Sequence, residues 1–156
     1  MYASELSRQT GLIPLWKPGA PEGELHLSDT RHILIIEDCV EDSFLLTRQL
    51  ARADLDDCVT VIGNGHDALE WLMAASKPPL AIFLDLNLPG MSGIDLIRSL
   101  KADPSLASVP VIVMTGSLNP HDVETCTALG ISAYLPKPIS LTTFIKIVSP
   151  LLPKKV

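Results

Sequence analysis

Residues 80–90 have the sequence Leu-Ala-Ile-Phe-Leu-Asp-Leu-Asn-Leu-Pro-Gly, in which an apolar run ends at an acidic residue and a turn. A short apolar run that is bounded by turn residues is typical of a strand buried on both faces of a sheet. The run Leu80–Leu84 therefore predicts such a strand, with Asp85 at its end. The following Pro89-Gly90 pair indicates a turn, so Asp85 lies between a strand and a loop.

The same alternation of apolar runs and turns continues along residues 31–156. Five short apolar runs predict strands, and helical patterns separate them. The runs are Ile33–Ile36, Cys58–Ile62, Leu80–Leu84, Val109–Met114 and Ala133–Leu135. Five strands that alternate with five helices predict an α/β fold with a parallel sheet covered on both faces and right-handed crossovers.

Capping residues indicate where several of these helices begin and end. Asp42 precedes a run of apolar residues and predicts the N-cap of the first helix. Asn64 and the glycine after it predict a turn before the second helix. Asn119 precedes a proline at the first helical position, and Gly130 lies where a glycine would end that helix. Ser140 predicts the N-cap of the last helix.

The composition is typical of one globular domain in a reducing compartment. The chain has 156 residues, of which 47% are hydrophobic, and its longest apolar stretches are far shorter than the roughly 20 residues of a membrane span. Its net charge of −6 disfavours nucleic-acid binding, which requires clustered Lys and Arg. Cys39, Cys58 and Cys126 are scattered singly, which is typical of reduced thiols. With no secretory signal, we expect a cytoplasmic protein without membrane contact.

Residues 1–30 differ from the rest of the sequence. They contain three prolines and three glycines and no sustained period of a helix or strand. Such a segment buries too little apolar surface to offset its ordering entropy, so we interpret it as a flexible or loosely docked extension of a domain at residues 31–156. The apolar residues 12–16 leave two alternatives, docking to a partner or lying on the chain's own domain.

Side chains with useful chemistry follow four of the predicted strands. Glu37-Asp38 follows the first strand, Asp85 the third, Thr115 the fourth and Lys137 the fifth. In parallel α/β sheets, ligands bind beyond the carboxyl ends of the strands. Three carboxylates, a hydroxyl and an ammonium are therefore expected at one rim. Each feature alone is also typical of a solvated loop or a helix cap, and the interpretation depends on their conjunction.

The three carboxylates predict a magnesium site. Carboxylates in one pocket repel each other, and a hard divalent cation with oxygen ligands removes that repulsion. Glu37, Asp38 and Asp85, with a backbone carbonyl near Asn87, would form such a site, and no softer ligand favours zinc or copper. An ionised Asp85 could act as a nucleophile and form an aspartyl-phosphate, with Mg²⁺ and Lys137 supplying positive charge.

Four segments together resemble the receiver domain of response regulators in two-component signalling. They are Ile33–Asp38, Phe83–Gly93, Val111–Gly116 and Ala133–Pro138. The resemblance covers about residues 31–152, and the segments are specific in combination, although none is so alone. It implies a flavodoxin-like α/β fold, a five-stranded parallel sheet with strand order 2-1-3-4-5 and five helices.

The resemblance also implies the phosphoacceptor and the metal ligands. Asp85 would accept a phosphoryl group from a histidine kinase or a phosphotransfer protein. Glu37 and Asp38 match the acidic metal pair of the family, and the Asn87 carbonyl matches a further ligand of Mg²⁺. Asn87 and Ser117 occupy the positions that tune the lifetime of the phosphate in such proteins.

A second set of residues matches the switch of the family. Thr115 corresponds to the switch hydroxyl and Lys137 to the lysine that binds the phosphate. Tyr134 corresponds to the aromatic residue that turns inward as the threonine moves toward the phosphate. Receiver domains often have a cis peptide at the position of Lys137-Pro138. Cys39-Val40 departs from the Asn-Pro of many relatives, which affects partner specificity rather than the chemistry.

No output domain is expected after the last helix. Residues 150–156 are too few for a DNA-binding or enzymatic module, so output is expected from contact with a downstream protein, through the last two strands and helices. Apart from its own phosphoryl transfer and dephosphorylation, the chain is not expected to be an enzyme. Stand-alone receivers of this kind include partners of phytochrome-type histidine kinases, often dimeric, so a homodimer is one alternative.

Three rival interpretations use the same pattern. A haloacid-dehalogenase-type phosphatase also has an aspartyl nucleophile after a strand, but it requires a second Asp where this chain has Asn87. A pseudo-receiver keeps the fold without phosphorylation, and the intact set of rim residues disfavours it. A nucleotide or flavin binder of similar topology is disfavoured because the sequence has neither G-x-G-x-x-G nor a P-loop.

Overall fold

The computed structural model describes residues 32–55, 58–116 and 119–151, which form five strands and five helices. The strands are β1 (Ile33–Ile36), β2 (Val59–Ile62), β3 (Ala81–Asp85), β4 (Val111–Thr115) and β5 (Ala133–Pro136). The helices are α2 (Val40–Arg52), α3 (Gly65–Ala74), α4 (Gly93–Ala102), α5 (Pro120–Ala128) and α6 (Leu141–Val148). The strands pair in parallel in the order β2-β1-β3-β4-β5, which confirms the predicted fold class and strand order.

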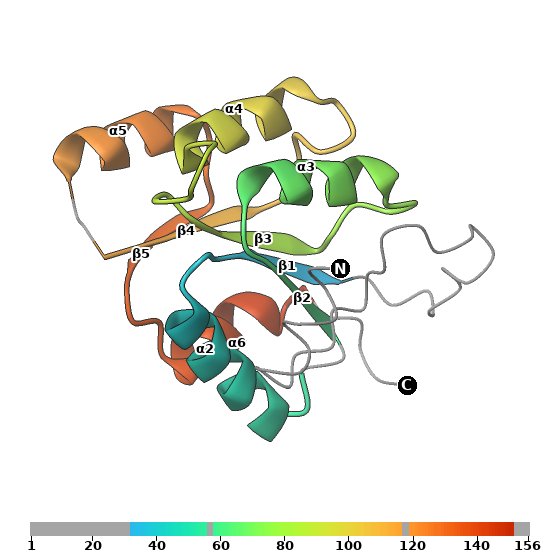
Figure 1. The fold of residues 1–156 in the computed structure, drawn as a ribbon, viewed down its shortest axis with the longest axis vertical. Coiled ribbons are helices and arrows are strands. Elements are labelled where there is room, and N and C mark those ends of the chain that lie inside the picture. The colour runs from blue at the N-terminus through green and yellow to red at the C-terminus, as the bar shows by residue number, and fades with distance from the viewer. Residues whose placement is uncertain (1–31, 56–57, 117–118, 152–156) are drawn as a thin grey trace. The chain divides into compact units, whose positions relative to one another are not determined.

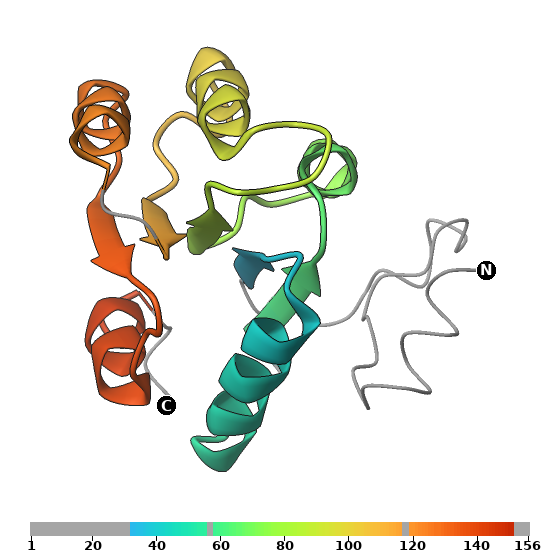
Figure 2. The same ribbon diagram turned by 60° about the vertical axis from the view of Figure 1, so that its left-hand side comes forward.

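Helices cover both faces of the sheet. Helices α3, α4 and α5 lie on one face, and α2 and α6 lie on the other (Figure 1, Figure 2). Because side chains alternate along a strand, Leu34 and Ile36 of β1 belong to one apolar cluster and Ile35 belongs to the other. In the second cluster, Phe83 of β3 packs on Phe144 of α6 with ring centroids 4.7 Å apart. The central strands are thus buried on both faces, which fixes the positions of their ends.

The strand boundaries differ slightly from the predicted runs. The run that begins at Val109 becomes a strand only at Val111, because the Val109 N–H is used in a turn and Pro110 has no N–H for a strand ladder. Strands β3 and β4 extend through Asp85 and Thr115. Asp85 and Thr115 are therefore the last residues of two buried strands.

The predicted N-cap at Asp42 is wrong. Helix α2 begins at Val40, with Cys39 in the capping position and Asp42 inside the first turn. The Cys39 carbonyl already accepts a hydrogen bond from the Ser43 N–H at 3.0 Å, and Oε1 of Glu37 accepts one from the Cys39 N–H at 3.0 Å, which stabilises the turn before the helix. A carboxylate in the first turn is also favourable, since the N-terminal end of a helix carries partial positive charge.

The predicted caps at Asn119 and Ser140 are confirmed, and Asn64, where only a turn was predicted, is the N-cap of α3. The side chains of Asn64, Asn119 and Ser140 accept hydrogen bonds from backbone N–H groups in the first turns of α3, α5 and α6. Gly130 has a φ of +83°, a conformation that glycine adopts without the strain of a side chain, and it follows the end of α5.

Two predictions fall outside the described residues. The extension at residues 1–30 and the position Ser117 belong to the part of the chain that the structure does not describe. Among the helices that are described, none combines the length and the hydropathy that a bilayer crossing requires.

Candidate functional site

The sheet brings three carboxylates together at its carboxyl edge. Strands β1 and β3 are neighbours, so Glu37 and Asp38, which follow β1, lie beside Asp85 at the end of β3. Oxygen atoms of the three side chains lie within 4.8 Å of one another. Glu37 and Asp85 are buried and Asp38 is exposed, so the cluster opens to solvent on one side. A set of only oxygen donors suits a hard divalent cation such as Mg²⁺.

Lys137 is the cation that this cluster contacts in the described structure. Its Nζ lies 2.8 Å from Oδ2 of Asp85 and 3.2 Å from Oδ2 of Asp42, and it also forms an ion pair with Oε2 of Glu37. The backbone positions it, because the Lys137 N–H donates to the Thr115 carbonyl at 2.7 Å, where β5 ends beside β4. The Lys137-Pro138 peptide is cis, as the resemblance implied.

The charges of the cluster are mutually dependent. Burial raises the pKa of Glu37, and the nearby Asp85 adds to this, while hydrogen bonds from Lys137 and the Cys39 N–H lower it in part. Burial alone would lower the pKa of Lys137, but hydrogen bonds to Asp85 and Glu37 and the charges of both raise it above its ordinary value. Lys137 is therefore protonated at neutral pH and acts as the counterion of the carboxylates.

Both carboxylate oxygens of Asp85 have a defined partner. Oδ1 accepts a hydrogen bond from the Asn87 N–H at 3.0 Å, and Oδ2 accepts one from Lys137. The loop after Asp85 is tied to α4, because the Gly93 N–H donates to the Leu86 carbonyl at 3.1 Å. These contacts hold the Asp85 carboxylate in one orientation. The Asn87 side chain is exposed at the rim, and the role of its carbonyl as a metal ligand stays a prediction.

Two of the three residues of the predicted switch, Thr115 and Tyr134, are in contact. Thr115 is buried at the end of β4, and Tyr134 is half-buried on the neighbouring strand β5. Burial raises the pKa of Tyr134, as do the nearby Cys126 and Asp122, whereas a hydrogen bond with the Thr115 side chain lowers it. Movement of the Thr115 hydroxyl would therefore change the environment of Tyr134 directly.

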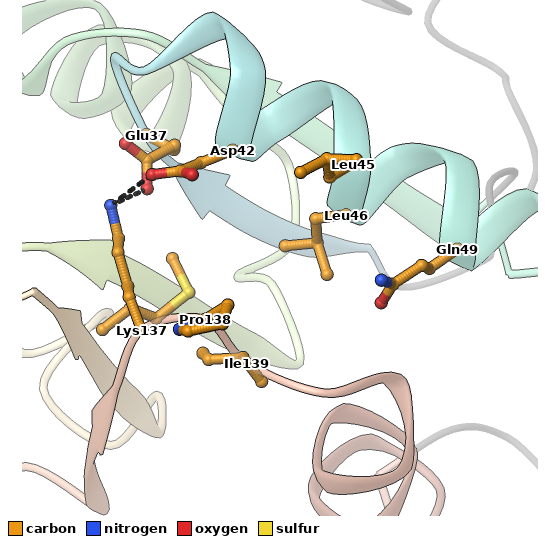
Figure 3. A pocket seen from close by; sticks show the side chains of 9 residues that line it. Glu37, Asp42, Leu45, Leu46, Gln49, Lys137, Pro138 and Ile139 are labelled. Carbon is orange, nitrogen blue, oxygen red and sulfur yellow. Dashed lines mark hydrogen bonds and ion pairs between the residues drawn. The ribbon is translucent and has the colours of Figure 1, made fainter.

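The contact between Asp42 and Lys137 was not predicted from the sequence. Asp42 was interpreted as a helix cap, whereas it lies at the rim and contributes a fourth carboxylate near the cluster (Figure 3). A signal existed, because a helix that begins directly after the acidic pair places its first turn at the same rim. Beside this contact, a cavity of about 90 Å³ lies between α2 and the loop after β5, with Leu46 and Ile139 in its lining (Figure 3).

Comparison with known proteins identifies the family. The family model of the response regulator receiver domain matches residues 33–149. The chain belongs to this family. The response regulator Rcp1 of Synechocystis sp. is 33% identical over 121 residues, which cover 74% of this chain and 82% of Rcp1. The chain spans only 58%, 60% and 57% of three plant two-component response regulators that it also matches.

Solved structures agree with this assignment. The phosphorylated cyanobacterial phytochrome response regulator RcpA is 29% identical, with a TM-score of 0.66, and the match covers 78% of this chain and 91% of RcpA. The Mn²⁺-bound form of Rcp1 is 30% identical, with a TM-score of 0.65, and the match covers 80% of this chain and 99% of Rcp1.

Family membership settles the coarse function. Receiver domains are signalling domains rather than classical enzymes, and phosphorylation and binding of a divalent metal at the acidic pocket are general to the family. Membership of this family excludes two of the rival interpretations, the haloacid-dehalogenase-type phosphatase and the nucleotide or flavin binder. The pseudo-receiver, which has the fold but is not phosphorylated, is distinguished from a working receiver by the site residues of this chain.

Proposed function

We propose that this chain is a single-domain response regulator that accepts a phosphoryl group on Asp85. The observation that carries the proposal is the position of Asp85, buried at the end of β3, between the Asn87 N–H and Lys137 Nζ and within the carboxylate cluster. The donor is a histidine kinase or a phosphotransfer protein, and the similarity to a phytochrome response regulator supports a phytochrome-type kinase. The homodimer stays a prediction.

The chain's own residues account for the transfer. An Asp85 carboxylate oxygen attacks the phosphorus atom of the donor, and the bond from phosphorus to the donor's leaving group breaks as the new P–O bond forms. Lys137 donates hydrogen bonds to a phosphoryl oxygen as charge develops on it. Glu37, Asp38 and Asp85, with the Asn87 carbonyl, would hold Mg²⁺. When bound, this ion supplies positive charge that the carboxylates and the phosphoryl group share.

The signal follows from a change around Thr115. Its hydroxyl donates to a phosphoryl oxygen, and Tyr134, which already shares a hydrogen bond with it, follows that movement. The surface of α5 and β5 then differs between the two states and binds a downstream protein. Water later hydrolyses the aspartyl-phosphate on the domain itself, at a rate that Asn87 and Ser117 tune.

The domain boundary belongs to the same proposal. Residues 31–156 form the receiver domain, residues 1–30 are an extension that is not needed for phosphorylation, and the protein works in the cytoplasm. The family match to residues 33–149 supports this boundary.

Phosphorylation of the wild-type protein tests the proposal. We expect a mass gain of one phosphoryl group after incubation with acetyl phosphate and Mg²⁺, and no gain in EDTA, because the carboxylate cluster then repels the anionic donor. Intact-mass spectrometry measures both. No gain in Mg²⁺, under conditions that label a control receiver domain, would contradict the proposal and favour a pseudo-receiver.

Replacement of Lys137 tests its two roles, as counterion and as phosphate ligand. In EDTA, Lys137→Met is expected to lose about 2 kcal/mol of unfolding free energy, because buried carboxylates lose their partner. Mg²⁺ should restore most of this loss, since it binds only the folded cluster. Urea unfolding with and without Mg²⁺ measures both values. The variant should also bind Mg²⁺ at least as tightly as the wild type but show no phosphate-dependent change.

Lys146→Met is the matched control, because Lys146 is exposed on α6 and its loss changes the net charge equally. It should leave the unfolding free energy within about 0.5 kcal/mol of the wild type. Equal losses in both variants would show that Lys137 has no special role as counterion.

A further inference from the structure

Asp42 is the outermost of the three carboxylates that contact Lys137. Its Oδ2 lies 3.2 Å from Nζ, and its side chain is 47% exposed. The side chains of Glu37 and Asp85 are only 3% and 6% exposed. Figure 3 shows Lys137 extended from the loop after β5 toward Glu37 and toward Asp42 on the first turn of α2. The contact thus connects two separate elements at the mouth of the site.

The number of donors on Lys137 makes this contact consequential. A lysine ammonium has three N–H groups, and three carboxylates surround this one. A phosphoryl group on Asp85 also requires a hydrogen bond from Lys137. At least one of the three carboxylates therefore has to give up its contact with the Lys137 ammonium. Glu37 and Asp85 belong to the metal cluster, whereas Asp42 does not, so a bound cation would compete for the first two. Of the three carboxylates, Asp42 is thus the one whose contact with Lys137 a bound cation would leave undisturbed.

We propose that Asp42 is a positioning residue that holds Lys137 toward α2 in the unphosphorylated protein and thereby slows phosphorylation of Asp85. The inference rests on the proposed function of Asp85. The restraint has two physical parts. Asp42 occupies a donor of Lys137 that the phosphoryl group needs, and its negative charge lies at the opening through which an anionic donor enters. Phosphorylation releases the contact between α2 and the loop after β5.

The rate of phosphorylation by acetyl phosphate in Mg²⁺ tests the proposal. We expect Asp42→Asn to react about fivefold faster than the wild type, the size of effect that a partly exposed ion pair gives. Glu41→Gln is the matched control, because Glu41 is the adjacent exposed carboxylate and its contact is with Cys39. It should change the rate less than twofold. Asp42→Glu, which keeps a carboxylate at the position, should keep the wild-type rate within about twofold.

Measuring the same rates at low and high ionic strength separates the two physical parts of the restraint by Asp42. The part of the rate gain that comes from the freed donor of Lys137 should remain at high salt, whereas the part that comes from the charge of Asp42 at the opening is screened there. An equal gain in Asp42→Asn and Glu41→Gln would overturn the proposal, as would an unchanged or slower rate in Asp42→Asn.

A second measurement does not depend on phosphorylation. In metal-free protein, competitive acetylation of Lys137, measured by peptide mass spectrometry, should be about twofold faster in Asp42→Asn than in Glu41→Gln, because the uncharged asparagine no longer forms the ion pair that restrains Lys137. Equal labelling of Lys137 in the two variants would contradict the proposed restraint of Lys137 by Asp42. If the wild type takes up no phosphoryl group while the labelling differs, the function of Asp85 fails and the contact stands.

Discussion

The Asp85→Asn variant is expected to gain no phosphoryl mass from acetyl phosphate and Mg²⁺, whereas the wild-type protein gains one. An amide is uncharged and its oxygen is a much weaker nucleophile than a carboxylate oxygen, so no aspartyl-phosphate forms. The shape of the site is kept, because asparagine is nearly isosteric and its oxygen can still accept a hydrogen bond from the Asn87 N–H or from Lys137. Intact-mass spectrometry and peptide mapping of the wild-type label measure the result.

Asp95→Asn is the matched control for this experiment. Asp95 is exposed on α4 and pairs with Arg98, so its replacement removes the same charge away from the site. This control should be labelled like the wild type. Loss of labelling in Asp85→Asn should not reflect unfolding, because the change removes one of three clustered carboxylates and relieves their repulsion without metal. Stable labelling of the Asp85→Asn protein would refute the assignment of the phosphoacceptor.

The strand ends were predictable because they combine two independent patterns. Buried central strands need continuous apolar runs, and the polar residue that ends each run marks the edge of the sheet. Asp85 and Thr115 follow from this rule directly. The resemblance to the family added the switch role of Tyr134, which stays a prediction, and the cis peptide between Lys137 and Pro138, which is confirmed.

The details of α2 were not predictable in the same way. The sequence has apolar residues at positions 44, 45, 46 and 50, and a pattern alone does not decide which of them face the sheet. Leu50 is buried and Leu46 is half-buried, but Phe44 and Leu45 are 43% and 55% exposed. The start of the helix decides this, and it depends on a side-chain contact of Glu37 with the Cys39 N–H. The position of Asp42 beside Lys137 follows from the same helix start at Val40, which places residue 42 in the first turn.

Gly93→Ala is expected to destabilise the domain by about 3 kcal/mol or more, although alanine is the better helix former. A Cβ atom at Gly93 would lie 2.6 Å from Cα of Leu86 and 2.9 Å from the carbonyl oxygen of Asp85. Both are backbone atoms, one of Asp85 and one of the residue after it, so a side-chain rotation cannot relieve the clash. Helix α4 or the loop after β3 has to move. Urea unfolding measures the loss, and phosphorylation should be slower because the loop orients Asp85.

Gly116→Ala is the control for Gly93→Ala at the opposite side of the same site. Gly116 follows Thr115 directly, and a Cβ there meets nothing within 4 Å, so its replacement should change the unfolding free energy by no more than about 0.5 kcal/mol. The sign at Gly93 is the decisive result. If this glycine served only as a flexible first residue of α4, alanine would stabilise the helix by up to about 1 kcal/mol. A gain in stability would therefore contradict the close packing of α4 on the loop after Asp85, and a large loss would confirm that packing.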